Sequence, residues 1–327
     1  MSKLVTIYGG SGFVGRYIAR RMAKQGWRVR IAVRRPNEAM FVKPYGVVGQ
    51  VEPVLCNIRD DASVAQVMLG ADAVVNCVGI LSENGRNRFD TVQAEGAGRV
   101  ARIAAEQGVE SLVHISAIGA DAESKSNYAR SKAEGEAAIQ SHFPAAVILR
   151  PSIIFGAEDE FFNRFASMAT LSPVIPLVGA GTRFQPVYVD DVARAAEIAL
   201  TKGCDAGVYE LGGAEVASFR QLITQMLAII RRRRVVIGLP FWIGRIMAFS
   251  FDMLQATSGG LFSNSVLTRD QLKNLAKDNV VAPDARGLKE FGITPTTMTA
   301  VLPDYLWRYR PSGQYSDIKE SARNLRT

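Results

Sequence analysis

Three glycines near the N-terminus constrain the fold more than any other feature of this sequence. Gly9, Gly12 and Gly15 lie between a run from Leu4 to Tyr8, which predicts a strand, and a stretch from Phe13 to Gln25, which predicts a helix. A glycine-rich turn in this position lets the backbone present the amino end of the helix to a pyrophosphate. The sequence therefore predicts a dinucleotide site. Its expected contact residues here are Gly9, Ser11, Gly12, Phe13, Val14 and Gly15.

The first 150 residues alternate between short β-branched runs and longer helical patterns. This alternation is typical of βαβ units, and right-handed crossovers then give a sheet with its ligand crevice at the carboxyl ends of the strands. The expected strands are Leu4–Tyr8, Arg28–Val33, Glu52–Cys56, Ala73–Val78, Leu112–Ser116 and Ala146–Leu149. The expected helices are Phe13–Gln25, Ala62–Leu69, Phe89–Gln107 and Ser126–His142. The predicted fold class is α/β, a Rossmann-type doubly wound parallel sheet with a smaller, interleaved C-terminal lobe.

The regular pattern loosens after Pro151, where turns rich in proline and glycine follow. We expect residues 1–150 to form the nucleotide domain and residues 151–327 to form a C-terminal lobe with a docking tail. The run from Val187 to Leu200 predicts a strand end and a helix that returns to the main sheet. Residues 185–212 would then complete the first domain.

The scarce residue types exclude several kinds of site. Cys56, Cys77 and Cys204 are widely spaced and flanked by apolar residues, which indicates a reducing compartment. With only two histidines, His114 and His142, the chain has almost no material for a metal site or a Ser-His-Asp triad, so we expect no metal. No signal peptide precedes the first strand, so the fold is expected to begin at residue 1 in a cytosol-like space.

Positive charge is concentrated at the start of the chain. The formal net charge is +8, and residues 1–37 hold nine basic residues and no acidic one. This predicts an anionic ligand or partner near this end, while the alternative for Arg16 to Lys24 is a solvated helix face. Nucleic acid is not expected, because no basic stripe interleaved with aromatic residues accompanies the charge.

The ends of the second, third and fourth strands predict which dinucleotide is bound. An NAD-specific site places a carboxylate after the second strand, but Arg34 and Arg35 stand there, and guanidinium groups favour a 2′-phosphate. The prediction is NADP(H), in particular NADPH. The alternative is that one or both arginines are solvated loop charges. Further contacts are expected from Asn57, Ile58, Val78 and Gly79.

Tyr128 and Lys132 lie four residues apart on a predicted helix and therefore share one face. With this spacing an ammonium can lower the pKa of a phenol and also reach the nicotinamide ribose. Their place directly after the fifth strand favours a functional pair over a chance spacing.

These motifs resemble the extended and atypical short-chain dehydrogenase/reductase family. The resemblance rests on Gly9–Gly15, Asn57–Asp60, Asn76–Gly79, Tyr128 with Lys132, and Arg150–Gly156. Within that family the chain is similar to NADPH-binding accessory subunits of respiratory complex I, particularly in Asn76–Leu81, Ser116–Asp121, Gln185–Asp191 and Leu267–Val281. The resemblance implies bound NADPH, which Ser116, Tyr128, Lys132 and Pro151 would also contact. It implies complex I subunits as partners and a peripheral place on the cytoplasmic face of a bacterial inner membrane, or its matrix-side equivalent.

Two positions depart from the family pattern. Reductases of the extended type resemble one another in carrying a Ser or Thr hydroxyl two residues beyond the position of Ser116. This chain has Ile118 there, and its side chain cannot donate a hydrogen bond to a substrate oxygen. The family's Asp at the adenine position is replaced by Asn57. We therefore expect a retained cofactor site, an impaired catalytic site and a structural or assembly role in the complex.

The C-terminal third predicts how the chain is held. Arg231–Arg234 precedes an apolar stretch to Leu254, in which Arg245 and Asp252 would share one helix face opposite Trp242, Ile246, Met247 and Phe249. This favours an interfacial helix on an anionic membrane surface, supported by a basic tail containing Arg308, Arg310, Lys319, Arg323 and Arg326. The tail follows Pro303–Pro311, where aromatic residues alternate with charge, so we expect this segment at an interface rather than in a core. One alternative is a helix buried in the lobe. The alternative function is an NADPH-dependent reductase or epimerase that acts on a small carbonyl or sugar-nucleotide, with Tyr128 and Lys132 as its catalytic residues.

Overall fold

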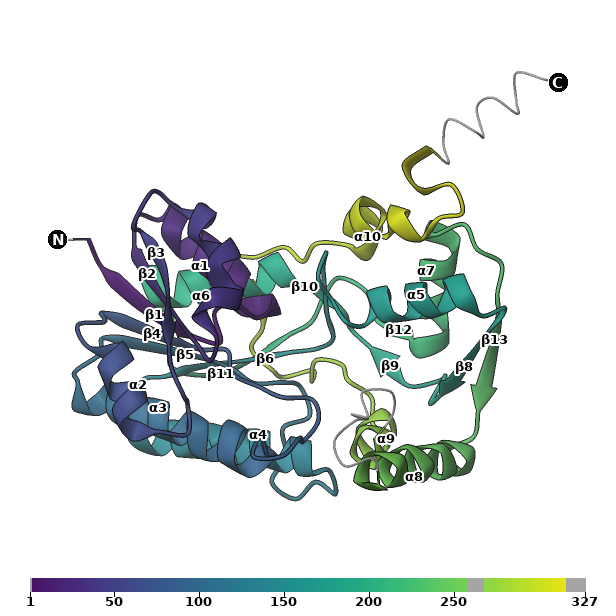
Figure 1. Ribbon diagram of the computed structural model, residues 1–327, viewed down its shortest axis with the longest axis horizontal. Coiled ribbons are helices and arrows are strands. Elements are labelled where there is room, and N and C mark those ends of the chain that lie inside the picture. Colours follow the sequence, from purple (N-terminus) through teal and green to yellow (C-terminus); the bar gives the residue numbers. More distant parts are fainter. Residues whose placement is uncertain (1, 258–267, 316–327) are drawn as a thin grey trace.

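The computed structural model describes residues 2–257 and 268–315. Two parts lie side by side: a sheet domain formed mainly by the first half of the chain, and a lobe formed mainly by the second half (Figure 1). The chain passes between them several times. The predicted residues Lys319, Arg323 and Arg326 of the basic tail lie outside the described residues.

A seven-stranded parallel sheet forms the centre of the first part. Its strand order is β11-β6-β5-β4-β1-β2-β3, and all neighbouring strands are parallel. The strands are β1 (Leu4–Tyr8), β2 (Arg28–Val33), β3 (Val51–Leu55), β4 (Ala73–Asn76), β5 (Ser111–Ile115), β6 (Val147–Pro151) and β11 (Gly207–Leu211). The order reverses between β1 and β4, so a ligand crevice is expected at the carboxyl ends of these strands.

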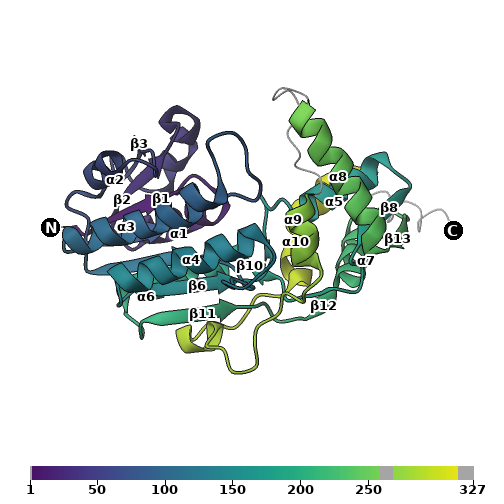
Figure 2. The same ribbon diagram turned by 90° about the horizontal axis from the view of Figure 1, so that it is seen from below.

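Helices cover both faces of this sheet (Figures 1 and 2). One face carries α1 (Phe13–Lys24) and α6 (Val189–Thr201), and the other carries α2 (Asp61–Met68), α3 (Glu95–Glu106) and α4 (Asn127–His142). Strand residues alternate between the two cores, as β4 illustrates: Ala73 and Val75 pack with α1 and α6, whereas Val74 packs with α2 and α3. Because the strands are buried on both faces, their sequences are nearly continuous runs of apolar residues.

The lobe has its own core of aromatic and aliphatic residues. Its helices are α5 (Phe162–Leu171), α7 (Phe219–Ile229), α8 (Phe241–Thr257), α9 (Arg269–Leu275) and α10 (Met298–Leu306). Short strands pair as β7 (Ile154–Phe155) with β10 (Val187–Tyr188), β8 (Val174–Val178) with β13 (Val235–Leu239), and β9 (Arg183–Phe184) with β12 (Ala217–Ser218). The short helices η1 (Pro36–Tyr45), η2 (Asp90–Ala94), η3 (Leu288–Phe291), η4 (Trp307–Tyr309) and η5 (Gly313–Tyr315) lie in the connections.

The predicted α/β fold is confirmed, and the six strands and four helices expected in the first 150 residues are present with ends shifted by a residue or two. The longest expected helix, Phe89–Gln107, divides into the π-helical turn η2 and α3. The predicted strand and helix from Val187 to Leu200 correspond to β10 and α6, and α6 packs on α1.

Two expectations for the C-terminal third are wrong. Val235–Leu239 is a strand rather than part of the apolar helix, because it pairs with β8; Pro240 follows the strand, and α8 begins at Phe241. The segment around Tyr305, which we expected to be unsuited to a core, has Tyr305 and Leu306 buried in the lobe. The Tyr305 hydroxyl donates to the buried Asp159, so this polar tip is satisfied.

Within the described residues, every helix is too short or too polar to cross a membrane.

Candidate functional site

The loop between β1 and α1 has the geometry that a pyrophosphate site requires. Gly9 has a φ of +74°, a conformation that strains other residues. A Cβ atom on Gly15 would lie 2.5 Å from the carbonyl oxygen of Gly9, so glycine is needed for α1 to pack this closely. Gly12 caps α1 without a side-chain hydrogen bond. The first amides of the helix, those of Phe13 and Val14, therefore remain for an anion at the positive end of the helix dipole.

Arg16 supports this loop, a role that the sequence analysis missed. Its guanidinium donates to the carbonyl oxygens of Ser11 at 3.0 Å and Gly12 at 3.3 Å, and it pairs with Glu158 at 3.4 Å. The position of Arg16 in the sequence could have indicated this role, because a long side chain in the first turn of a helix reaches back toward the residues that precede the helix.

Part of the positive charge at the start of the chain is compensated by distant acids. Lys3 pairs with Glu110, and Arg21 pairs with Asp190 at 2.6 Å and with Glu197 at 2.9 Å. The sequence predicts an anionic ligand or a solvated helix face here, and neither describes Arg21, which joins α1 to α6. These ion pairs could not be predicted from the basic segment, because it contains no acidic residue and the partner acids lie far along the chain.

The two arginines after β2 have different surroundings. Arg34 donates to Oδ1 of Asn87 at 3.4 Å and so reaches across to the loop that follows β4. Arg35 instead pairs at 3.0 Å with Glu38 of η1, and both of these side chains are largely exposed. The two residues predicted to act together therefore point to different neighbours.

The ends of β3 and β4 complete this side of the crevice. The exposed Asn57 accepts hydrogen bonds at its Oδ1 from the backbone amide of Arg59 at 3.2 Å and from its Nε at 3.4 Å. Ile58 is buried beneath this turn. After β4, the amide of Val78 donates to Oδ1 of Asn76 at 3.1 Å, which turns the chain at the crevice.

Tyr128 and Lys132 lie together on α4, as their spacing predicts. The Lys132 Nζ atom is 6.0 Å from the centroid of the Tyr128 ring and donates to the carbonyl oxygen of Ile115 at 3.2 Å. Burial lowers the pKa of Lys132 to about 8 and raises the pKa of Tyr128 to about 12. The expected lowering of the phenol pKa by Lys132 is wrong, because burial dominates. The phenol is thus a proton donor at neutral pH rather than a base.

The surroundings of Lys132 fit the hydroxyl groups of a ribose. Oε1 of the buried Gln93 has no hydrogen-bond partner within the structure. A Cβ atom added to Gly79 would come within 3.4 Å of Nζ of Lys132 and 3.6 Å of this oxygen, so the absence of a side chain leaves space beside both groups. A ligand hydroxyl can both accept from the ammonium and donate to the amide oxygen, which suits the sugar of a nicotinamide nucleotide.

The residues expected at the substrate oxygen offer it no free hydroxyl. Ser116 is buried and donates to Glu136 of α4, and Arg150 holds the same carboxylate at 2.5 Å. The Ser116 hydroxyl thus belongs to an ion-paired network under α4. Ile118, two residues further on, contributes its backbone amide to the carbonyl oxygen of Pro151 at 3.0 Å, and its side chain has no donor.

The amino end of α4 is held by the lobe. Asp270 of α9 accepts from the Ser126 hydroxyl at 2.6 Å, from the Asn127 amide at 2.8 Å and from the Tyr128 amide at 3.1 Å. A carboxylate in this position also favours the positive end of the helix. Nothing in the sequence spacing indicates this contact, because the two segments are more than 140 residues apart.

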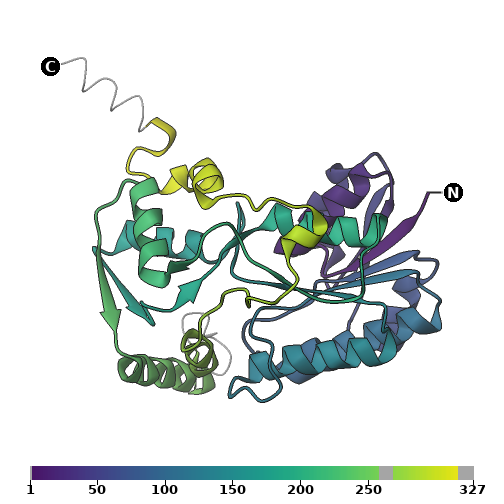
Figure 3. The ribbon, with the colours of Figure 1, turned by 180° about the vertical axis from the view of Figure 1, so that it is seen from behind.

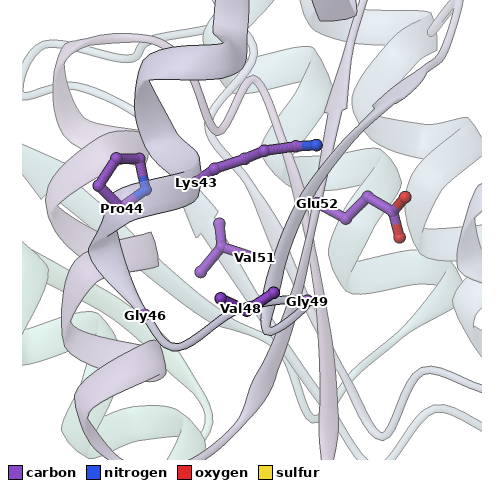
Figure 4. A pocket seen from close by; sticks show the side chains of 7 residues that line it. All are labelled: Lys43, Pro44, Gly46, Val48, Gly49, Val51 and Glu52. Carbon is purple, nitrogen blue, oxygen red and sulfur yellow. The ribbon is translucent and has the colours of Figure 1, made fainter.

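A separate hollow lies between η1 and the start of β3, where Lys43, Val48 and Val51 line it (Figure 4). It is at the amino end of β3, whereas the predicted dinucleotide residues lie at the carboxyl ends of the strands. The part of the chain that the structure describes contains no group of three His, Cys, Asp or Glu side chains suited to a metal ion.

The sequence of residues 5–212 matches the NAD dependent epimerase/dehydratase family. The chain belongs to this family. It is 33% identical to the NADH dehydrogenase (ubiquinone) 1 alpha subcomplex subunit 9, mitochondrial, of Arabidopsis thaliana, over 95% of this chain and 79% of that protein. It is 31% identical to the ceramide reductase of Caulobacter vibrioides over 64% of each chain.

The fold agrees with solved structures of the family. The UDP-glucose 4-epimerase of Thermotoga maritima, solved with UDP-glucose, superposes with a TM-score of 0.71 at 15% identity, covering 94% of this chain and 99% of that one. At this identity the likeness concerns the fold alone. Family membership makes a nicotinamide dinucleotide the class of ligand for the crevice described above.

Proposed function

We propose that this chain is a nucleotide-binding accessory subunit of respiratory complex I that holds NADPH and does not turn over a substrate. The mitochondrial relatives carry the name of such a subunit, and their likeness extends over nearly the whole chain. In this proposal residues 1–150, with 185–212, bind the nucleotide, and the remaining lobe docks on the assembly.

One observation carries the proposal: the nucleotide side of the crevice is intact while the substrate side has no hydroxyl donor to offer beside Tyr128. The glycine loop, Lys132 and Gln93 present donors and acceptors for a dinucleotide. Ser116 is committed to Glu136, and Ile118 is aliphatic. A carbonyl oxygen would therefore receive a hydrogen bond from Tyr128 alone.

The lobe offers a surface for docking. Trp242, Ile246, Phe249 and Met253 of α8 follow helical spacing and are each more than half exposed, while Ala248 on the other side is buried. Gly244 allows α8 to lie close to Val178 of β8. The helix is thus neither fully buried nor free, because one face packs on the lobe and the other presents an apolar stripe.

The arrangement of charges on α8 differs from the one expected. Asp252 does not lie opposite the apolar residues, because it pairs with Arg269 at 2.9 Å and the same guanidinium lies over the ring of Phe249. The preceding basic cluster is also divided. Arg232 and Arg234 donate to the carbonyl oxygens of Tyr309 and Ala169, whereas Arg231 and Arg233 are exposed. An anionic membrane surface beside the assembly suits an apolar stripe with such flanking cations.

Native purification tests the proposal. Solubilised membranes are fractionated by size, and the fractions that contain this chain are analysed for co-eluting proteins and for nucleotide released by alkaline extraction, which preserves NADPH. We expect the chain to elute with complex I subunits and to carry NADPH. In the membrane, the proposed position is the cytoplasmic side of a bacterial inner membrane or the matrix side of a mitochondrial one. A chain found entirely in the soluble fraction, alone, contradicts the docking role.

The second candidate function is an NADPH-dependent reductase, which the presence of both Tyr128 and Lys132 favours. Bound nucleotide would supply the hydride. Tyr128 would donate its phenolic proton to the carbonyl oxygen of a small substrate, and Lys132 would stabilise the phenolate that remains. Turnover of about 1 per second or more with a defined carbonyl substrate would favour this function over the structural one.

A further inference from the structure

We propose that Arg59, together with Arg34, forms the binding site for the 2′-phosphate of NADPH and that Arg35 lies outside it. The inference deepens the proposed function, because it rests on NADPH as the nucleotide. It assigns the discrimination between NADPH and NADH to a residue that follows β3 rather than to a pair of adjacent residues after β2.

The sheet places Arg34 and Arg59 at the same edge. Strands β2 and β3 are parallel neighbours, and the last residues of the two strands, Val33 and Leu55, are register partners. Both chain segments therefore leave the sheet side by side, one toward Arg34 and the other, through the turn at Asn57, toward Arg59.

The two guanidinium groups contact consecutive residues of one loop. Nη1 of Arg34 donates to Oδ1 of Asn87 at 3.4 Å, and Nη1 of Arg59 donates to the carbonyl oxygen of Arg86 at 2.9 Å. The loop is closed by paired backbone hydrogen bonds between Asn84 and Asn87, of 3.1 and 3.0 Å. Both cations thus contact adjacent residues of the same turn.

The charges of these two arginines are not compensated by the described residues. Arg34 donates to the side-chain amide oxygen of Asn87. Arg59 donates to the side-chain amide oxygen of Asn57 and to the backbone carbonyl oxygen of Arg86. All three acceptors are uncharged. Nearby arginines differ: Arg35 pairs with Glu38 at 3.0 Å, and Arg99 pairs with Asp61. Two uncompensated guanidinium groups that contact adjacent residues of one turn can bind a phosphate dianion by charge-assisted hydrogen bonds.

Equilibrium binding of NADPH and NADH to the purified full-length protein tests the proposal. Arg59→Gln and Arg34→Gln are each expected to lower NADPH affinity about tenfold or more and to change NADH affinity by less than about twofold, because NADH lacks the 2′-phosphate. Arg35→Gln is the matched control and should leave both affinities nearly unchanged. Retained NADH binding shows that each variant is folded.

A substitution at Asn57 provides an independent test. Asn57→Asp should lower the preference for NADPH at least as much as Arg59→Gln, because a carboxylate in this position would pair with Arg59. Asn57→Ala, which removes the acceptor without adding charge, should have a smaller effect. If the unmodified protein prefers NADPH and Arg59→Gln keeps the same ratio of affinities, the assignment of Arg59 is wrong. If the unmodified protein binds NADPH and NADH equally, the proposed cofactor is wrong as well.

Discussion

Lys132 is a buried ammonium that donates to the carbonyl oxygen of Ile115, its one hydrogen-bond acceptor among the described residues, and nucleotide binding should change its protonation. Burial lowers its pKa to about 8, against the opposing influence of Glu136 and Cys77. A bound dinucleotide supplies acceptors and negative charge, which raise that pKa. We therefore expect NADPH binding to take up a proton above pH 8 and the affinity to fall as the pH rises through this value. Calorimetric titrations at about pH 9, in buffers of different ionisation enthalpy, measure the uptake.

Lys132→Met is the control for this experiment, since it removes the titrating group, and it should bind NADPH without proton uptake at that pH. The linked effect on stability has a definite sign. Because the unfolded lysine keeps the ordinary pKa of 10.5, the unfolded chain binds more protons between pH 8 and 10.5. The contribution of Lys132 to the free energy of unfolding without nucleotide therefore rises across that interval. An NADPH affinity that is constant from neutral pH to about pH 10 would contradict the prediction.

Tyr128 tests whether the crevice is catalytic. If the chain only binds nucleotide, Tyr128→Phe should leave NADPH affinity within about threefold and leave the chain in the assembled complex, because the ring contact with Phe89 is kept. Affinity and co-sedimentation with membranes are measured side by side. A reductase would instead lose its turnover in this variant, so any NADPH oxidation that Tyr128→Phe abolishes would favour the second function.

At the scale of elements, the contact between α9 and α4 links the lobe to the nucleotide site. Asp270→Ala removes the carboxylate that accepts from Ser126, Asn127 and Tyr128. We expect the free energy of unfolding to fall by about 1–3 kcal/mol, the range for loss of a helix cap with charge-assisted bonds. NADPH affinity should fall too, because Tyr128 and Lys132 lie on the helix whose start is loosened.

Thermal and urea unfolding with and without NADPH measure this effect. Asp284→Ala is a suitable control, because Asp284 is an exposed acid of the same segment outside α9. Equal unfolding midpoints for Asp270→Ala and Asp284→Ala would show that the contact does not stabilise α4.

The predictability of each element follows from how local its causes are. The strands and helices around the glycine loop could be predicted because alternating apolar runs and the turn at Gly9 to Gly15 determine them locally. The strand Val235–Leu239 was missed because its pairing partner, β8, is distant in sequence. The same holds for site residues: Tyr128 and Lys132 follow from spacing, whereas Arg16, Glu136 and Asp270 act through contacts made only in the folded chain.

At the scale of the whole molecule, the two parts of the chain divide the proposed roles. The proposed nucleotide site lies at the carboxyl ends of the strands of the large sheet, and the apolar stripe belongs to α8 of the lobe. Figure 3 shows the sheet domain and the lobe side by side. Since α9 contacts both α8 and α4, the lobe can be loosened by changes at either surface. Variants at the stripe should therefore separate docking from nucleotide binding only if they leave the buried face of α8 intact.

The double variant Trp242→Gln with Ile246→Gln meets that condition, since both side chains are more than half exposed. Removing two large apolar groups from a membrane-facing or subunit-facing stripe should weaken association with respiratory membranes by about tenfold or more, while NADPH affinity stays the same. Leu171→Gln, a change of an exposed apolar residue on α5, is the matched control and should sediment as the unmodified protein does. A stripe variant that remains on the membranes like this control would show that α8 is not the docking surface.

The basic cluster before β13 gives the last prediction, because its four arginines divide into two structural classes. Arg231 and Arg233 are exposed, so replacing both with glutamine should weaken membrane association and make the association that remains more sensitive to salt. Arg232 and Arg234 hold carbonyl oxygens at 2.7 and 2.8 Å, so the same replacement there should lower the unfolding midpoint. Sedimentation at increasing salt and thermal unfolding distinguish the two variants. If both pairs affected only stability, the cluster would be a structural turn and would have no part in docking.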